Sequence, residues 1–299
     1  MERNHVEIME VCPRDGWQNL PDFIPTEDKI RYISGMLDAG VRTMQITSFV
    51  HPRAIPQLRD AREVTRAILA AYPDRCFNAL IPNVVGAKNA VESGLKEVCY
   101  VISVSESHNR ANISRTHEES FGELEQIRHN YPDLDITVGL PTTFGCPFEG
   151  RMPLRRVLDF VERLAGLGIT KVELSDTIGA GDPVQVRATF LAVGREFPHL
   201  TLAAHMHDTR NNGVINSWAA MESGAVLIHG AMGGLGGCPF APGASGNTST
   251  EDLVYLLERA GYHSGIDFER YMDALRVMHA TVHGNYSGHQ LTIKKPENA

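Results

Sequence analysis

Several features of membrane, secreted and nucleic-acid-binding proteins are missing from this 299-residue sequence. It has no run of about 18 apolar residues, so we expect no membrane-spanning helix. Its first residues, Met1 to His5, lead into a strand-like segment without the apolar stretch of a secretory signal. The five cysteines are odd in number and irregularly spaced, which is atypical of a disulfide framework. We therefore expect a protein of the reducing cytoplasm.

Positive charge is also scarce. Lys and Arg number 28 against 36 Asp and Glu, which gives a formal net charge of −8. This balance argues against nucleic acid or an anionic membrane as the main partner, but it leaves room for a local basic pocket. Hydrophobic residues make up 42% of the chain and charged residues 21%, which is enough apolar material for a large core.

Short apolar, β-branched segments alternate with segments of helical periodicity along the chain. This alternation is typical of βαβ units and a parallel sheet, either an open doubly wound sheet or a closed barrel. The number of strands and the chain length favour an α/β fold of the (β/α)₈ TIM-barrel type. We expect one domain over 1–299, with a glycine-rich loop after the eighth strand, extra C-terminal helices and a frayed end at 291–299. The expected strands are 6–11, 43–49, 76–81, 97–103, 135–140, 171–174, 201–205 and 225–229.

Three expected helices have the clearest periodicity, at 27–39, 154–167 and 214–221. For the first of them, Thr26 is the expected N-cap and Gly40 the expected stop.

The most informative segment is His205-Met206-His207-Asp208, at the end of the seventh expected strand. Active sites of such barrels lie at the carboxyl ends of the strands. Residues two apart on a strand point the same way, so both imidazoles can face one metal ion. The alternative interpretation is that His205 caps the core and His207 begins a solvated loop.

A second segment, Arg14 and Asp15, follows the first expected strand. Asp15 offers an oxygen ligand for a hard cation. Arg14 offers a fixed cation that can hold a carboxylate or stabilise an enolate oxygen. An ordinary turn is the alternative, because Pro, Asp and Gly are common turn residues.

The third segment is glycine-rich and follows the eighth expected strand. Glycines such as Gly236 let the backbone approach a ligand closely. Cys238 in such a loop can be an exposed, reactive thiol, and Asn247 can complete a metal shell. The alternative is a flexible lid without chemistry. The segment is not a dinucleotide-binding fingerprint, because it comes last in the fold and no suitable acidic residue follows it.

Closure of the barrel would bring these three segments together, because the seventh, eighth and first strands become neighbours. Asp15, His205, His207 and Asn247 would then surround one point. Two nitrogen and two oxygen ligands leave positions for substrate oxygens on a roughly octahedral Mg²⁺ or Mn²⁺, with Zn²⁺ as the alternative.

With these residues identified, the chain resembles the 3-hydroxy-3-methylglutaryl-CoA lyase family. This family lies within a wider group of metal-dependent barrels that includes isopropylmalate synthases and pyruvate carboxyltransferases. Gly-Leu-Gly-Gly-Cys-Pro, followed by Ala-Ser-Gly-Asn, is the most specific part of the likeness and favours the lyases over the synthases. The likeness runs from Val6 to about Ile266, and its other motifs are 13–19, 47–50, 145–150, 174–179 and 205–209.

The resemblance implies a lyase that performs a metal-dependent retro-Claisen cleavage of a 3-hydroxyacyl-CoA to acetyl-CoA and a keto acid. Candidate substrates are 3-hydroxy-3-methylglutaryl-CoA and related thioesters such as citramalyl-CoA. The resemblance also implies that the ion is bound by the four residues just named, Asp15, His205, His207 and Asn247.

Further roles are implied in the same way. Arg14 would stabilise the enolate or the thioester carbonyl, and Cys238 would lie on a mobile loop and take part in proton transfer. Either His207 or Asp176 could shuttle the proton, although Asp176 could instead cap the following helix. Residues in the same motifs are expected to bind the substrate: Gln18, Gln45, Thr177 and Gly236.

The chain also departs from the family's pattern. The lyases carry a glutamate where this chain has Gln45, and an amide cannot balance the charge of an arginine and a metal ion as a carboxylate can. Cys12, Trp17 and the segment 141–144 differ too. Our hypothesis is that metal binding is kept and that the substrate differs from 3-hydroxy-3-methylglutaryl-CoA. Normal turnover of that thioester would contradict it.

Two other functions stay open. One is a condensing acyltransferase that joins an acyl-CoA to an α-keto acid, and the other is a metal- and CoA-binding protein with impaired catalysis, suggested by Gln45. A homodimer is expected by analogy with related barrels. Cys76 and Cys99 are expected to be small core residues, and Cys146 a structural one. The histidines expected at the surface are His108, His117 and His263.

Overall fold

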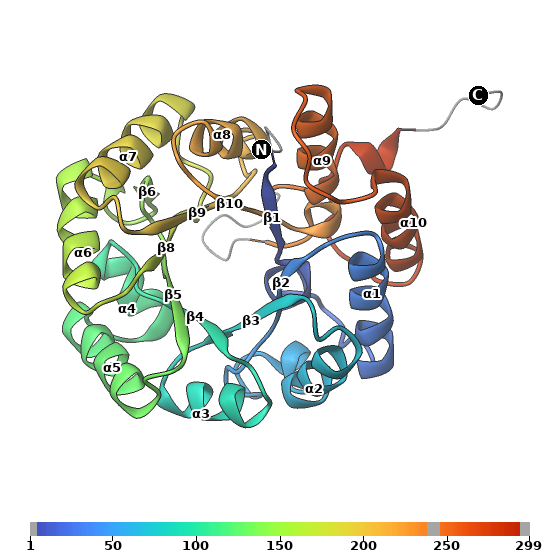
Figure 1. Cartoon of the computed structure of the whole chain (residues 1–299), viewed down its shortest axis with the longest axis horizontal. Coiled ribbons are helices and arrows are strands. Elements are labelled where there is room, and N and C mark those ends of the chain that lie inside the picture. The colour runs from blue at the N-terminus through green and yellow to red at the C-terminus, as the bar shows by residue number, and fades with distance from the viewer. Residues whose placement is uncertain (1–4, 238–245, 294–299) are drawn as a thin grey trace.

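The computed structural model describes residues 5–237 and 246–293. Eight parallel strands close into a barrel in the order β1-β10-β9-β8-β5-β4-β3-β2, with helices outside the ring (Figure 1). The prediction of a (β/α)₈ barrel is therefore confirmed. The barrel strands are β1 (Glu7–Glu10), β2 (Thr43–Ser48), β3 (Cys76–Ile81), β4 (Glu97–Val101), β5 (Asp135–Leu140), β8 (Lys171–Asp176), β9 (Thr201–Met206) and β10 (Leu227–Gly230).

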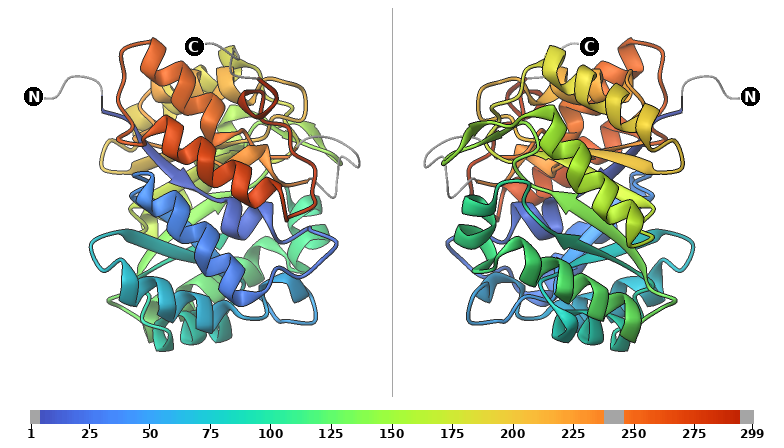
Figure 2. Two further views of the ribbon diagram at one scale, coloured as in Figure 1. Left: turned by 90° about the vertical axis from the view of Figure 1, so that its right-hand side faces the viewer. Right: turned by 90° about the vertical axis from the view of Figure 1, so that its left-hand side faces the viewer.

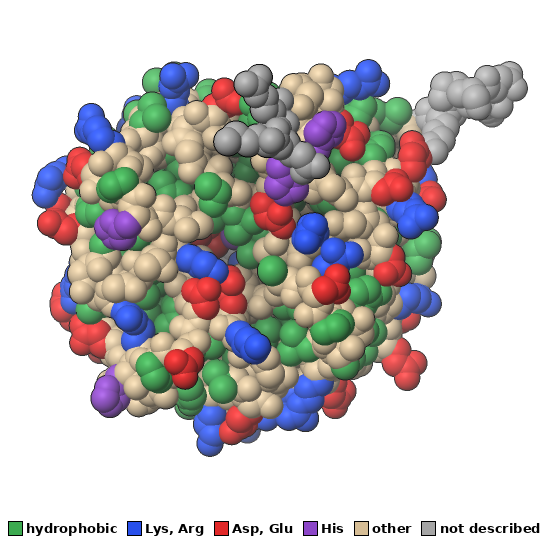
Figure 3. Space-filling view, viewed as in Figure 1, with side chains coloured by type: hydrophobic (Ala, Val, Ile, Leu, Met, Phe, Trp, Pro, Cys, Tyr) green, Lys and Arg blue, Asp and Glu red, His purple; other side chains and the backbone are tan. Residues whose placement is uncertain are grey.

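The helices wrap the flanks of the barrel, as two side views show (Figure 2). Two extra helices follow the glycine-rich segment, as predicted, and the second of them packs against α1. None of the helices in residues 5–237 and 246–293 is long and apolar enough to cross a membrane. On the face shown in Figure 3, Lys and Arg side chains are interspersed with Asp and Glu. The α-helices are α1 (Thr26–Asp38), α2 (Ala61–Ala71), α3 (Val84–Glu92), α4 (Glu106–Ile113), α5 (His117–Asn130), α6 (Leu154–Gly166), α7 (Pro183–Glu196), α8 (Gly213–Met221), α9 (Thr250–Arg259) and α10 (Phe268–His279).

The periodicity of each segment matches its burial. In α6, Val157, Val161 and Leu164 lie on one face at helical spacing and are buried against the barrel. Strand β2 is buried along nearly its whole length because barrel strands are covered on both faces. Gly40 follows the C-cap of α1 at φ +105°, a conformation that favours glycine, so its prediction as the helix stop is confirmed.

Several element boundaries differ from the predicted ones by one or two residues. Thr26 begins α1 instead of capping it, and its hydroxyl donates to Asp60 at 2.8 Å. The last barrel strand runs from Leu227 to Gly230, because the N–H of Ala225 bonds back to α8 instead of entering the sheet. A short antiparallel hairpin of β6 (Gly145–Cys146) and β7 (Gly150–Arg151) was not predicted.

Two side chains were misplaced by the sequence interpretation. Cys76 is exposed at the start of β3. Its apolar neighbours indicated a core position, but the first residue of a barrel strand lies at the open end. His108 is buried, and its Nδ1 lies 2.8 Å from the Ser103 hydroxyl. The predicted core position of Cys99 and surface position of His263 are confirmed. Cys146 is buried, and His117 is half-buried.

The Glu10 side chain connects the end of β1 to the segment after β10 and to helices α9 and α10 by hydrogen bonds. The carboxylate is fully buried and accepts hydrogen bonds from the N–H groups of Cys12 and Met232, at 2.8 and 3.0 Å. It also accepts from the hydroxyls of Thr250, at the start of α9, and Tyr271, in α10. One side chain therefore fixes the turn after β1 relative to the glycine-rich segment and both C-terminal helices.

Replacing Glu10 with alanine should lower the free energy of unfolding by about 3 kcal/mol, because several buried donors lose their acceptor. Chemical denaturation with matched m-values measures this change. Glu162→Ala, at an exposed position of α6, is the control and should change stability by less than about 0.5 kcal/mol. Equal stabilities of the two variants would contradict the proposed tie.

Candidate active site

Arg14 and Asp15 lie on a π-helical turn, Cys12–Gly16, directly after β1. The N–H groups of both residues bond to the carbonyl of Val11, at 3.1 and 2.7 Å. Wide turns of this kind are frequent at functional sites because they re-aim side chains. Here the turn places a guanidinium and a carboxylate, both buried, at the carboxyl end of the barrel.

His205 and His207 leave the end of β9 on the same side, as the strand periodicity predicted. Their Nε2 atoms are 3.0 Å apart, and they lie 3.6 and 3.8 Å from Oδ2 of Asp15. Ligand atoms about 3 Å apart form the edge of a coordination shell with bonds of about 2.1 Å. These three side chains fit one divalent cation.

Asn247, the fourth predicted ligand, lies next to His207. A β-bridge joins it to His207, and its Nδ2 donates to the carbonyl of Leu235 at 3.1 Å. Its Oδ1 is buried and has no hydrogen-bond partner among the described residues. A buried amide oxygen without a donor is costly, and a cation is one partner that satisfies it. The structure therefore brings all four predicted ligands to one place.

Protonation states in the site suit a metal ion. Burial alone would raise the pKa of Asp15, but the Arg14 guanidinium and the two imidazoles hold it well below its usual range. Burial lowers the pKa of His205 to about 3, so this ring is neutral and keeps a free lone pair.

Arg14 organises the polar contacts around Asp15. Its Nη1 donates to Oδ1 of Asp15, and Gln18 donates to the same oxygen at 2.6 Å. Because Oδ1 is engaged by these two donors, Oδ2 is the oxygen that faces the histidines. Gln18 thus contacts a predicted metal ligand, and its predicted role in substrate binding stays a prediction.

Gln45 continues this network across the barrel interior. Its Oε1 accepts from Nε of Arg14, and its Nε2 donates to Oδ1 of Asn78 at 3.1 Å. Asn78 in turn donates to Glu97 at 3.3 Å. The amide therefore acts as acceptor on one side and donor on the other, which a carboxylate cannot do. Gln45 thereby joins Arg14, Asn78 and Glu97 in one chain of hydrogen bonds.

Asp176 ends β8 and is fully buried. Its carboxylate accepts from the N–H groups of Ala180 and Gly181, both at 2.9 Å, and burial raises its pKa. It closes a turn and does not cap the following helix, because Asp182 is the N-cap of α7. The backbone N–H of His207 bonds to the Asp176 carbonyl at 3.3 Å, so the two candidate proton shuttles are neighbours.

Thr177 supports the segment 141–144, one of the departures from the family pattern. Its hydroxyl accepts from the N–H of Thr142, which has a positive φ of 64°. A β-branched residue in this conformation is strained, and such strain is characteristic of functional sites. Trp17, another departure, is buried and packs edge-on against Tyr32 of α1, so it belongs to the core.

The predicted catalytic thiol, Cys238, lies outside the described residues. Gly236 lies inside them and has φ +148°. A Cβ atom on Gly236 would lie 2.5 Å from Nδ2 of Asn247, so only glycine leaves the Asn247 side chain in place. The structure gives this predicted substrate-binding residue a steric role beside Asn247, a predicted metal ligand.

Gly236→Ala should weaken metal binding at least about tenfold, because Asn247 must move and the backbone is strained. Titration of Mn²⁺ into the purified protein measures this. Gly237→Ala is the matched control, since no atom of the residues that the structure describes lies within 4 Å of a Cβ there. Equal Mn²⁺ affinities in both variants would remove the steric argument.

Two interior residues were missed by the sequence interpretation. His229 of β10 has its Nδ1 3.3 Å from Nδ1 of His205, and Glu173 of β8 has Oε2 3.6 Å from Nδ1 of His229. Burial would raise the pKa of Glu173, but the imidazoles of His229 and His205 hold it below its usual value. The available signal was an ionisable residue at an interior position of each of two strands.

Comparison with known proteins agrees with this geometry. The family model described as HMGL-like matches residues 5–278. The chain belongs to this family. A hydroxymethylglutaryl-CoA lyase of Bacillus subtilis is 42% identical over 91% of this chain and 91% of its own length. The cytoplasmic 3-hydroxy-3-methylglutaryl-CoA lyase of Mus musculus is 38% identical over 90% of this chain and 79% of the relative.

Solved structures of the HMGL-like family show the same fold. The B. subtilis HMG-CoA lyase has a TM-score of 0.90 at 40% identity, covering 96% of this chain and 97% of the other. An HMG-CoA lyase of Acinetobacter baumannii, in complex with coenzyme A and 3-methylmalate, has a TM-score of 0.92 at 38% identity and covers 99% and 97%. The predicted assignment to the carbon–carbon lyases that act on CoA thioesters is confirmed.

Proposed function

We propose that this HMGL-like lyase cleaves a 3-hydroxyacyl-CoA by a retro-Claisen reaction that depends on Mg²⁺ or Mn²⁺. The single observation that carries the proposal is the convergence of Asp15, His205 and His207 on one point, beside Oδ1 of Asn247, which has no hydrogen-bond partner within the described part of the chain. Two oxygen ligands and room for substrate oxygens favour Mg²⁺ or Mn²⁺, with Zn²⁺ as the alternative.

The proposed metal ligands and Arg14 have different roles in the reaction. A divalent ion held by these four residues would lower the pKa of the substrate hydroxyl and orient the substrate's oxygens. Arg14 is held by Gln45 and Asp15, so its guanidinium is fixed before substrate arrives. A fixed cation next to the thioester carbonyl stabilises the enolate that forms when the C–C bond breaks.

Proton transfer is assigned to His207 and Asp176. Burial raises the pKa of Asp176, which makes it a better proton acceptor than an exposed aspartate. His207 lies beside it and contacts the ion site. We propose that one of the two accepts the hydroxyl proton and that Cys238 delivers a proton to the enolate carbon.

The acyl group is proposed to differ from 3-hydroxy-3-methylglutaryl. This rests on Gln45, whose amide occupies the position of a carboxylate in the family pattern and contacts Arg14. Because the A. baumannii relative is described with coenzyme A and 3-methylmalate, the CoA thioesters of methyl-substituted malates belong among the candidates. We also propose a homodimer and a cytoplasmic location, on the analogy and the cysteine content given above.

The test is a substrate panel with acyl-CoA mass spectrometry. Purified protein with Mg²⁺ or Mn²⁺ is offered 3-hydroxy-3-methylglutaryl-CoA, citramalyl-CoA and 3-methylmalyl-CoA. We expect a short acyl-CoA and a keto acid to appear from one panel member, and EDTA to abolish the reaction. Turnover that persists in EDTA would contradict metal dependence. Preference for 3-hydroxy-3-methylglutaryl-CoA would contradict the role given to Gln45.

A second candidate function follows from the same amide. If the panel is silent while the protein still binds Mn²⁺, acetyl-CoA with an α-keto acid tests the condensing direction. Binding of metal and CoA without either reaction would indicate a non-catalytic member of the family.

A further inference from the structure

We propose that Glu173 and His229 are positioning residues for the metal centre. In this proposal they hold the His205 ring from behind and supply the buried negative charge that the amide of Gln45 does not provide. The inference rests on the ligand set of the proposed function, because His205 must bind the ion through Nε2.

The first step concerns the two nitrogens of His205. Nε2 faces Asp15 and His207, and a lone pair used for a metal ion leaves the hydrogen on Nδ1. Nδ1 lies 3.3 Å from Nδ1 of His229, and the two rings meet edge to face at 82°. The His205 Nδ1–H therefore donates to His229. Such an outer contact fixes the tautomer and the ring plane of a metal ligand.

The second step concerns Glu173. Its Oε1 accepts from the hydroxyl of Ser175 at 2.7 Å, and its Oε2 lies 3.6 Å from Nδ1 of His229. The carboxylate is 5% exposed. The carboxylate therefore lies next to His229, and the hydroxyl of Ser175 on the same strand fixes its orientation.

The third step is the charge of the interior. Arg14 contacts one carboxylate, that of Asp15, and one neutral amide, that of Gln45. Glu97 is the next carboxylate in the amide chain, but it is paired with Lys171 at 2.9 Å. Glu173 has no Lys or Arg within ion-pair distance among the described residues, and its one basic neighbour at that distance is His229. Its charge is therefore available to offset Arg14 and a divalent ion.

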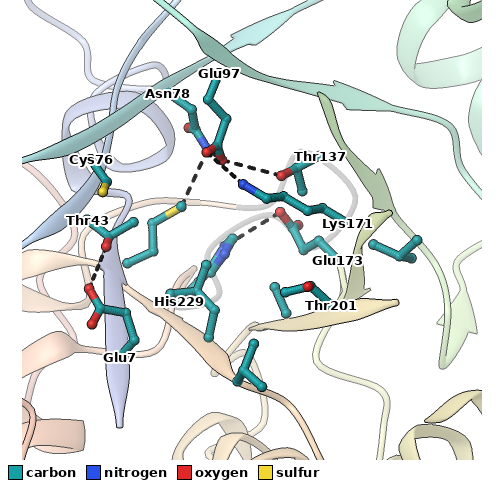
Figure 4. Close-up of a pocket in the computed structure, with 15 residues that line it drawn as sticks. Glu7, Thr43, Cys76, Asn78, Glu97, Thr137, Lys171, Glu173, Thr201 and His229 are labelled. Atoms are coloured by element: carbon teal, nitrogen blue, oxygen red, sulfur yellow. Dashed lines mark hydrogen bonds and ion pairs between the residues drawn. The ribbon is translucent and has the colours of Figure 1, made fainter. Parts of the chain in front are cut away.

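The fourth step is access from below. The described residues line a cavity of about 330 Å³ at the amino end of the barrel, opposite the metal ligands. Figure 4 shows Glu173 and His229 pointing toward each other inside the ring of lining residues. The strand starts Cys76 and Thr201 are exposed at the rim, whereas His229 is only 3% exposed. Small molecules can thus reach the positioning pair without passing the active site.

The first experiment uses this access. His229→Ala should weaken Mn²⁺ binding and lower kcat about 10- to 100-fold, with little change in KM. Added imidazole should restore part of kcat in His229→Ala, because the cavity admits it to the vacated space. His229→Asn keeps an acceptor near the position of Nδ1 and should stay within about threefold of wild type. Circular dichroism verifies that each variant is folded.

The second experiment moves the charge. Glu173→Gln should weaken Mn²⁺ binding about tenfold. Adding Gln45→Glu to that variant should recover most of the loss, because a carboxylate returns to the neighbourhood of Arg14. Gln45→Glu alone should not improve binding, since it adds a second negative charge and breaks the hydrogen bond to Asn78. Together with wild type, these three variants form a double-mutant cycle. The coupling energy between positions 45 and 173 for Mn²⁺ binding measures how far the two positions supply the same charge.

The outcomes separate the two proposals. If wild type binds no divalent ion, or if Asp15→Asn binds it as tightly, the proposed function fails. If wild type binds the ion and Asp15→Asn does not, two results overturn the inference alone. They are unchanged Mn²⁺ affinity and kcat in folded His229→Ala and Glu173→Gln, or independent effects at positions 45 and 173. Loss of kcat in His229→Ala that no concentration of imidazole restores would also count against the positioning role.

Discussion

Asp15→Asn should remove metal-dependent activity, with kcat/KM falling at least about 1,000-fold, or roughly 4 kcal/mol. The amide keeps the shape of the side chain but loses the charge that faces His205 and His207. With the amide oxygen at the Oδ1 position accepting from Arg14 and Gln18, the NH₂ group replaces Oδ2 and presents a donor to the histidines in place of a metal ligand. Titration calorimetry with Mn²⁺ and the acyl-CoA assay together measure both losses.

Asp22→Asn is the matched control for this experiment, because Asp22 lies a few residues along the same segment and is exposed. It should bind Mn²⁺ and turn over substrate as wild type does. An Asp15→Asn protein that keeps Mn²⁺ affinity within a few-fold of wild type would show that the ion lies elsewhere.

Arg14→Lys should lower kcat by about 100- to 1,000-fold, or roughly 3–4 kcal/mol, although the positive charge is kept. The planar guanidinium donates to Gln45 through Nε and to Asp15 through Nη1 at the same time. An ammonium group is a point charge that cannot satisfy both acceptors and also face the substrate carbonyl. Steady-state kinetics should therefore show a loss mainly in kcat, since the interaction is strongest in the transition state.

Arg53→Lys, at an exposed position after β2, is the corresponding control and should leave kcat unchanged. If Arg14→Lys raises KM while kcat stays near wild type, Arg14 binds the ground state and has no role in enolate stabilisation.

The convergence of Asp15, His205 and His207 could be predicted from sequence because it depends on two simple regularities. Side chains two apart on a strand share a face, which placed His205 beside His207. The first and last strands of a closed barrel are neighbours, which brought Asp15 to the same point. Neither inference needed the conformation of a single loop.

The rest of the site depends on contacts between segments far apart in the sequence, and no local sequence pattern indicates such contacts. His229 and Glu173 become relevant only through the register that sets β8, β9 and β10 side by side. Asp176 closing a turn instead of capping α7 depends on the N–H groups of the following loop. The exposure of Cys76 follows from the open lower mouth of the barrel, which apolar neighbours along the chain do not reveal.

Closure of the ring between β1 and β10 has a consequence for how the protein is made. Asp15 emerges early from the ribosome and Asn247 only after the last barrel strand, so a nascent chain lacks one of the proposed ligands until all eight strands have been made. An ion held by this set would therefore bind the closed barrel far better than a chain that ends before Asn247. Metal availability during biogenesis would then act as a selection for completely closed molecules, since ligand binding favours the state that contains the site.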